Sequence, residues 1–344
     1  MSMNEEKLQG TILRIQRMST EDGPGIRSTV FFKGCPLRCI WCHNPESISP
    51  KPQVHWVKSK CIGCRSCIEA CTKGALAATE RGITIDRSTC DSCAACVQAC
   101  PSTAMEGYGE VFGLDDLVRE VLKDKVYFEK SGGGVTLSGG EPTMQPTFAK
   151  ALLSSLKQGG IHTALDTCGQ CSWDSLKEML PHIDLVLYDL KVIDPEKHKS
   201  FTGIVNERIL DNLTRVSRSM EETGMPGDLW IRTPLIPGST VTSENLRGIG
   251  AFIRKNLGQS VSRWELCTFN NLCIHKYEGL GIDWGFKTSN LLAQDEAERL
   301  ASIARGSGVD PHIVHVSGPT RIGSKAEAQE QKAHLSIIKG GVCP

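Results

Sequence analysis

The chain has 344 residues, which is long enough for two domains or for one barrel with an insertion. Its 39 lysines and arginines balance 39 aspartates and glutamates, so no net charge attracts nucleic acid or anionic lipid. The opening residues are polar and charged, with no apolar run of the length that a signal peptide or a membrane span needs. These features predict a cytoplasmic protein that binds neither nucleic acid nor membranes.

Sixteen cysteines are the most unusual feature of the composition. Eleven of them lie between Cys35 and Cys100, as one C-x3-C-x2-C group followed by two C-x2-C-x2-C-x3-C groups. A reducing compartment favours metal ligation over disulfides, and cysteines so close in sequence make poor disulfide partners. The spacing therefore predicts metal centres, because one short loop can aim several thiolates at one point.

In chain order, the first predicted element is a β-branched and aromatic strand at residues 28–33, which leads into the first cysteine group. Residues 51–108 contain eight cysteines and no long periodic segment, so we expect metal rather than an apolar core to hold this region together. Polar residues after position 322 predict a loosely attached tail at 323–344.

Between residues 112 and 322, short strand patterns alternate with helical patterns, which is typical of βα units around a parallel sheet or barrel. The first helix, at residues 114–122, has apolar residues three or four positions apart on one face. Strands are then predicted at 134–138, 162–166, 184–190, 229–235, 263–268 and 312–317, with helices at 145–158, 206–222 and 243–256.

The first cysteine group, Cys35, Cys39 and Cys42, supplies three thiolates, one fewer than a closed tetrahedral site requires. A four-iron cluster held by three cysteines keeps one iron open for a substrate or cofactor. A zinc knuckle or a chance group of buried cysteines are the alternatives. The rarity of this spacing, its place after a strand and the aromatic Trp41 before the last cysteine favour the cluster.

Polar residues follow the predicted strands, and the carboxyl ends of barrel strands gather at one rim. After the second strand comes Ser138-Gly-Gly-Glu-Pro142, in which two glycines allow close backbone approach and the carboxylate suits an ammonium group. The later strand ends contribute Asp166 and Thr167, Asp189 and Lys191, Arg232 and Pro234, and Asn270. The sequence therefore predicts one ligand site at this rim.

Two motifs carry a family resemblance: Asp22-Gly-Pro-Gly-Ile-Arg27, and the cysteine loop that ends in Cys42-His-Asn-Pro-Glu46. They resemble the opening of the glycyl radical enzyme activating enzymes, a branch of the radical S-adenosylmethionine (SAM) superfamily. The resemblance implies that the cluster cleaves SAM to methionine and a 5′-deoxyadenosyl radical, which takes hydrogen from a backbone glycine of a partner glycyl radical enzyme. It also implies anaerobic metabolism, because oxygen destroys exposed clusters and glycyl radicals.

The same resemblance implies which residues bind SAM. The Gly-Gly-Glu segment matches the motif that binds the SAM amino group, and Lys191 of the D-x-K motif can pair with the SAM carboxylate. Asp166 matches a position near SAM that can help to hold a monovalent cation. Asn270 stands where the family often has a histidine, although an asparagine can still form a hydrogen bond. The expected set is Trp41, His43, Gly139, Gly140, Glu141, Asp166, Asp189, Leu190, Lys191, Arg232 and Asn270.

The two longer cysteine groups are similar to those of bacterial two-cluster ferredoxins, in which the fourth cysteine of each run ligates the other cluster. Paired zinc sites are the alternative, but they need no such swapped fourth ligand. Thr72 replaces the proline that usually follows the first run. One cluster is then expected on Cys61, Cys64, Cys67 and Cys100, and the other on Cys90, Cys93, Cys96 and Cys71. With all four ligands supplied, these clusters are expected to relay electrons from a reduced flavodoxin or ferredoxin.

The predicted fold is α/β: a partial (β/α)6-type barrel at residues 1–50 and 109–322, with an inserted ferredoxin-like α+β domain at 51–108. The predicted protein is an activase with three [4Fe–4S] clusters and SAM. It needs no catalytic side chain, because the radical comes from SAM. The alternative is a radical SAM enzyme that acts on a small molecule or peptide and uses its auxiliary clusters. An electron carrier alone would not need the barrel.

Overall fold

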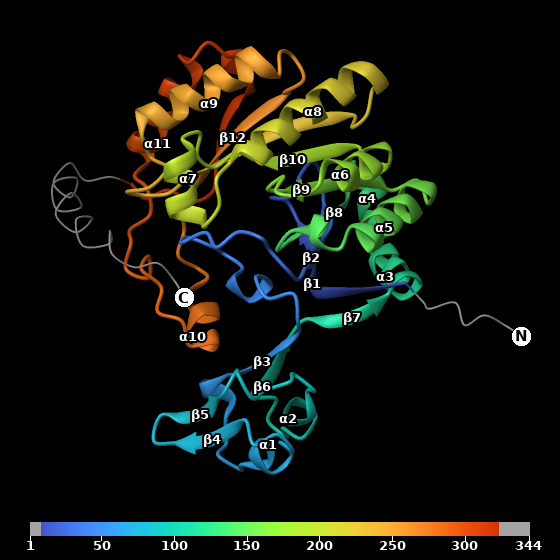
Figure 1. Ribbon diagram of the computed structural model, residues 1–344, viewed down its shortest axis with the longest axis vertical. Coiled ribbons are helices and arrows are strands. Elements are labelled where there is room, and N and C mark those ends of the chain that lie inside the picture. The colour runs from blue at the N-terminus through green and yellow to red at the C-terminus, as the bar shows by residue number, and fades with distance from the viewer. Residues whose placement is uncertain (1–7, 323–344) are drawn as a thin grey trace, which may run out of the picture.

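The computed structural model describes residues 8–322, and its main element is an open nine-stranded sheet (Figure 1). The strand order is β13-β12-β11-β10-β9-β8-β2-β1-β7. All neighbours from β13 to β2 are parallel, whereas β1 is antiparallel to both β2 and β7. The strands are β1 (Gln9–Ser19), β2 (Arg27–Phe32), β7 (Glu110–Gly113), β8 (Gly134–Gly139), β9 (His162–Thr167), β10 (Leu185–Asp189), β11 (Asp228–Leu235), β12 (Arg263–Thr268) and β13 (Val314–Ser317).

The seven predicted strands are confirmed as the seven parallel strands, and helices lie in the connections between them. Within the described residues, no helix is long and apolar enough to cross a membrane. The tail at 323–344 lies outside the described residues. The helices of this part are α3 (Leu114–Val121), α4 (Lys125–Ser131), α5 (Pro146–Gln158), α6 (Trp173–Met179), α7 (Pro195–Thr202), α8 (Glu207–Thr223), α9 (Ser243–Asn256), α10 (Ile274–Leu280) and α11 (Gln294–Arg305).

The two faces of the sheet differ in chemistry, because successive side chains of a strand point to opposite faces. In β11, Leu229, Ile231 and Leu235 belong to the main apolar core, which includes residues of α5, α8, α9 and α11. The alternate residues include Arg232, which lines a cavity on the other face. The face away from the core therefore carries the polar groups.

Residues 51–108 form a separate set of short elements below the sheet in Figure 1. Two antiparallel pairs, β3 with β6 and β4 with β5, flank two helices of one turn each. Their small core consists of Val54, Cys67, Leu76, Cys96 and Met105. The bounds are β3 (Gln53–Trp56), α1 (Ser66–Glu69), β4 (Leu76–Thr79), β5 (Gly82–Ile85), α2 (Ala95–Gln98) and β6 (Met105–Tyr108).

Candidate active site

The first cysteine group lies in a loop that leaves β2 and closes on itself. The backbone N–H of Gly34 donates to the carbonyl of Ser47 at 2.7 Å, and that of Cys35 donates to Ile48 at 3.1 Å. Gly34 has a φ of 96°, which allows the sharp turn out of the strand. The loop therefore holds Cys35, Cys39 and Cys42 over the carboxyl ends of the parallel strands.

All three thiols line a cavity of about 260 Å³ whose other walls come from the ends of β8 to β12. Most of the residues that the sequence predicted for ligand binding meet here, although they come from six strand ends. Of the eleven residues expected to bind SAM, eight line this cavity: Trp41, His43, Gly139, Gly140, Asp166, Asp189, Lys191 and Arg232.

The remaining three residues, Glu141, Leu190 and Asn270, are not among those that line the cavity. Leu190 is buried, and its carbonyl accepts a hydrogen bond from the Thr233 hydroxyl at 2.9 Å. Asn270 turns its side-chain oxygen to the backbone N–H of Leu272, at 3.2 Å. Phe269, the residue before Asn270, lines the cavity instead.

Glu141 is fully buried, and its carboxylate joins two strand ends. Its oxygens accept four hydrogen bonds: from the backbone and hydroxyl of Thr143, from the hydroxyl of Thr167, and from the backbone of Cys168. These bonds satisfy a carboxylate that would be costly to bury without partners. Glu141 therefore fixes the end of β9 relative to the end of β8.

Gly139 and Gly140 lie where side chains cannot fit. A Cβ atom on Gly139 would come within 2.4 Å of the Phe32 backbone nitrogen, and one on Gly140 within 2.3 Å of the Gly34 carbonyl oxygen. Gly139 also has a φ of 109°, which favours glycine. The two glycines let the end of β8 pack directly against the start of the cysteine loop.

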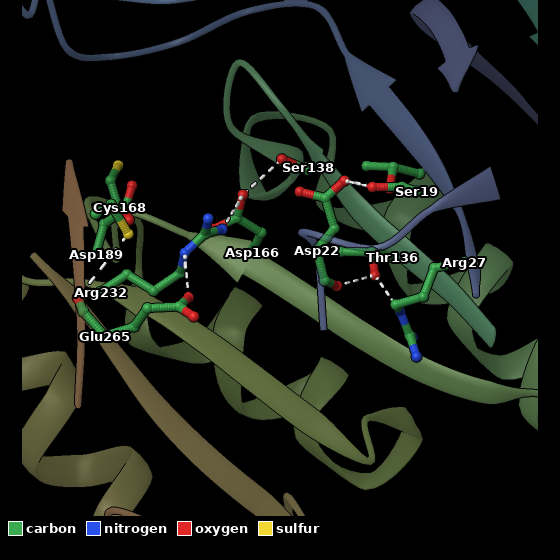
Figure 2. Close-up of polar contacts among 12 residues, drawn as sticks. Ser19, Asp22, Arg27, Thr136, Ser138, Asp166, Cys168, Asp189, Arg232 and Glu265 are labelled. Atoms are coloured by element: carbon green, nitrogen blue, oxygen red, sulfur yellow. Dashed lines mark hydrogen bonds and ion pairs between the residues drawn. The ribbon is translucent and has the colours of Figure 1, made fainter. Parts of the chain in front are cut away.

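Charged side chains line the cavity, among them Asp166, Asp189 and Arg232, whose polar contacts Figure 2 shows. Arg232 lies 3.7 Å from the Asp166 carboxylate and 3.4 Å from that of Glu265. Lys191 forms an ion pair with Asp189. Burial alone would lower the pKa of Lys191, but the charge of the Asp189 carboxylate and the hydrogen bond to it raise the pKa above its ordinary value. Lys191 is therefore a permanent cation in this cavity.

Asp166 gives the cavity a pH dependence that can be measured. Burial raises its pKa to about 7, and Asp189 adds to the rise, whereas Arg232 and a hydrogen bond from Ser138 oppose it. Because the folded-state pKa lies above the ordinary value of about 4, folding favours the protonated acid. The contribution of Asp166 to the free energy of unfolding therefore falls as the pH rises from about 4 to about 7.

We expect infrared difference spectra of the wild type minus Asp166→Asn to contain a protonated carboxyl band at about pH 5.5. The band should disappear as the pH passes through about 7, because the carboxyl then ionises. Subtracting the spectrum of the asparagine variant assigns the band to residue 166, because the variant lacks only this carboxyl group. A spectrum without this band at about pH 5.5 would contradict the assignment.

The thiols of the first cysteine group are poor ligands unless a metal supplies positive charge. Burial raises the pKa of Cys35 to about 12, and it also raises the pKa values of Cys39 and Cys42. Within residues 8–322, no group of three or more His, Cys, Asp and Glu side chains is arranged to hold a metal ion. A four-iron cluster differs from a single ion, because each cysteine binds a separate iron atom.

Two further cysteines line the cavity, Cys168 after β9 and Cys267 in β12. The C-x2-C spacing of Cys168 and Cys171 could suggest a redox pair, but the sequence favours packing or incidental roles for both, and for Cys267. The place of Cys267 in the cavity could have been predicted. It lies one residue before the end of a parallel strand, and every second side chain there points to the face that carries the cavity. Cys171 does not line the cavity and belongs to the main apolar core, which is consistent with a packing role.

Comparison with known proteins shows the class of this chain. Residues 29–246 match the radical SAM superfamily, so the chain is a radical SAM enzyme. The chain is 41% identical over 284 residues to the isethionate sulfite-lyase activating enzyme of Nitratidesulfovibrio vulgaris, covering 81% of this chain and 90% of that one. It is 41% identical over 305 residues to the trans-4-hydroxy-L-proline dehydratase activating enzyme of Clostridioides difficile, covering 88% and 98%.

A third relative, the (2S)-3-sulfopropanediol dehydratase activating enzyme of Klebsiella oxytoca, is 38% identical over 283 residues, covering 81% of this chain and 87% of that one. The chain thus belongs to the glycyl radical enzyme activating enzymes of the radical SAM superfamily. It cleaves SAM reductively with a [4Fe–4S] cluster and uses the radical to remove a hydrogen atom from a glycine of a partner enzyme.

Proposed function

We propose that Cys35, Cys39 and Cys42 hold the [4Fe–4S] cluster of this activase and that the adjoining cavity binds SAM. The observation that carries the proposal is the convergence of these three thiols with eight of the eleven expected SAM-binding residues on one cavity of about 260 Å³. When bound, the cluster supplies the electron for SAM cleavage. The chain's own residues bind and orient the substrate.

The charges of the cavity suit the methionine end of SAM, which carries both an ammonium and a carboxylate group. Lys191 and Arg232 are cations for the carboxylate, whereas Asp166 and Asp189 suit the ammonium group or a monovalent cation. The His43 Nε2 and Asp166 Oδ1 atoms are buried and have no hydrogen-bond partner among the described residues. Both atoms therefore retain a bonding capacity that a ligand can use.

In this proposal the two glycines and the glutamate of the Gly-Gly-Glu segment have different roles. Gly139 and Gly140 line the cavity and let the end of β8 pack against the cysteine loop, which brings their backbone to the place proposed for the SAM amino group. Glu141 acts mainly as a positioning residue, since the chain's own groups already donate four hydrogen bonds to its carboxylate. Leu190 and Asn270 have no assigned contact with SAM.

We further propose that residues 51–108 form a ferredoxin-like domain with two auxiliary [4Fe–4S] clusters, inserted into a partial barrel at 8–50 and 109–322. The two cysteine runs repeat one backbone geometry, which supports the proposal. A residue with positive φ, Arg65 or Ala94, precedes each one-turn helix, and the third cysteine of each run is buried within that helix. These clusters would use Cys61, Cys64, Cys67 and Cys100, and Cys90, Cys93, Cys96 and Cys71.

The fourth cysteines of the two runs, Cys71 and Cys100, also have the same hydrogen-bond geometry. The Cys71 thiol accepts a hydrogen bond from the backbone of Ala75 at 3.3 Å, and the Cys100 thiol accepts one from Ala104 at 3.2 Å. Backbone N–H groups aimed at sulfur stabilise thiolates and tune cluster potentials. With every iron ligated by protein, neither auxiliary cluster has a position for SAM. We therefore assign them the relay of electrons from a reduced flavodoxin or ferredoxin.

This relay predicts a difference between electron sources. Replacing Cys93 with alanine should lower activity with flavodoxin about tenfold or more, but activity with a strong chemical reductant much less, because the SAM cavity is intact. Cys171→Ala is the matched control, because it removes a cysteine of the main core that is no proposed cluster ligand. It should lower both activities only slightly and to the same extent. Equal large losses in Cys93→Ala with both electron sources would show that the auxiliary cluster has another role.

A further inference from the structure

A helix far along the chain contacts the backbone of the cysteine loop. Helix α10 lies between the sheet and residues 51–108 in Figure 1. The Tyr277 hydroxyl donates to the carbonyl of Cys42 at 2.8 Å, and the indole N–H of Trp284, just beyond the helix, donates to the carbonyl of Ile40 at 3.0 Å. Both side chains are buried, and their rings stack 4.9 Å apart. The loop carbonyls are therefore held by long-range side-chain donors.

Lys276, the residue before Tyr277, holds the next part of the loop. An ammonium group has three N–H donors, and that of Lys276 meets three acceptors: the His43 carbonyl at 2.8 Å, Asn44 Oδ1 at 2.7 Å and Glu46 Oε1 at 2.9 Å. The Glu46 side chain is only 1% exposed. This contact explains the His-Asn-Pro-Glu sequence after Cys42, because two of its four side chains bind one partly buried cation.

Other cations complete the anchor at Glu46. Arg14 lies 3.2 Å from the same carboxylate oxygen as Lys276, and the buried Lys33 donates to the Glu46 backbone carbonyl at 2.7 Å. A buried carboxylate is costly unless it is paired, so these cations fix the end of the loop in one place. Neither Lys276 nor Tyr277 lines the proposed SAM cavity. Their effect on it must pass through the loop.

The opposite side of α10 rests on the inserted segment. A Cβ on Gly279 would meet the Tyr108 hydroxyl at 3.1 Å and His55 at 3.2 Å, so the helix lies in close contact with both residues there. Arg87 donates to the Gly279 carbonyl at 3.3 Å. Cys90, a proposed auxiliary-cluster ligand, lies three residues after Arg87. One short helix thus contacts both the cysteine loop and the segment that carries the auxiliary cysteines.

We propose that Lys276 and Tyr277 are positioning residues for SAM cleavage: they hold the Cys42–Glu46 backbone, and with it one wall of the SAM cavity, against the inserted segment. The wall formed by Cys42, His43 and Asn44 is the part of the cavity that these donors reach. Removing a donor removes no cluster ligand but loosens this wall. The inference rests on the SAM site proposed above.

Tyr277→Phe tests the proposal most cleanly, because it removes one oxygen atom and keeps the ring stack with Trp284. We expect full iron content after anaerobic reconstitution, with kcat/KM for SAM cleavage about fivefold lower, in line with the loss of one hydrogen bond to the loop. The change that SAM causes in the electron paramagnetic resonance spectrum of the reduced protein should be weaker or altered in shape. Only a cluster that binds SAM contributes to that difference spectrum.

Lys276→Met should have a larger effect, about a hundredfold on kcat/KM, because it also leaves the buried Glu46 carboxylate with one cation fewer. Tyr127→Phe is the matched control: this tyrosine on α4 is 48% exposed, and its change should alter neither rate nor spectrum. A Tyr277→Phe protein with wild-type kcat/KM and a wild-type difference spectrum would overturn the positioning role. A wild-type protein whose spectrum does not respond to SAM would instead overturn the proposed SAM site.

Discussion

Replacing Cys35, Cys39 and Cys42 together with alanine is expected to abolish 5′-deoxyadenosine formation. The iron content should fall from about twelve to about eight atoms per chain, because one of the three proposed four-iron clusters loses its protein ligands. The two auxiliary sites share no cysteine with this group, so they should still assemble. The measurement is iron and acid-labile sulfide per chain after anaerobic reconstitution, together with product analysis by chromatography.

A matched triple variant separates ligand loss from a general effect of removing cysteines. Alanine at Cys61, Cys64 and Cys67 should also lower the iron content to about eight, since it removes three ligands of one auxiliary cluster. It should nevertheless retain SAM cleavage with a strong chemical reductant, because the SAM cavity is untouched. If the Cys35, Cys39 and Cys42 variant kept all its iron or still cleaved SAM, the assignment of the open cluster would be wrong.

The sequence allowed the parallel part of the fold to be predicted, because each buried strand is a compact apolar run between polar strand ends. Strands β8 to β12 were all located within about two residues. The two strands that are not parallel to the rest, β1 and β7, were missed. In β1, Arg14, Gln16 and Arg17 interrupt the apolar pattern, and β7 has only four residues, two of them exposed. Such strands form because a neighbouring strand offers a pairing edge, β2 to β1 and β1 to β7, and local sequence does not reveal that edge.

Much of the candidate site was also predictable, because the carboxyl ends of parallel strands meet at one rim whatever the details of packing. Asp166, Lys191 and Arg232 reach the same cavity for this reason. The roles of Glu141 and Tyr277 could not be predicted, since they depend on hydrogen bonds between distant segments. The bond from Tyr277 to Cys42 joins residues 235 positions apart, and no spacing rule links them.

A partner enzyme should gain a glycyl radical when it is incubated with this protein, SAM and a reductant. The reason is that the partner's glycine is the hydrogen donor in the reaction that defines the family. Partner and SAM should be required together for efficient turnover. Replacing the partner's radical glycine with alanine should remove the radical, while SAM binding in the cavity beside Gly140 and Lys191 remains.

Electron paramagnetic resonance of the separated proteins after such an incubation tests the central claim most directly. The partner should be a glycyl radical enzyme encoded beside this gene, with its glycine-to-alanine variant as the control. We predict a carbon-centred doublet that stays with the partner, is absent from this chain and is lost in the control. Consumption of a small molecule or peptide with SAM, while no partner ever gives the doublet, would contradict the account and favour an enzyme that acts on that substrate directly.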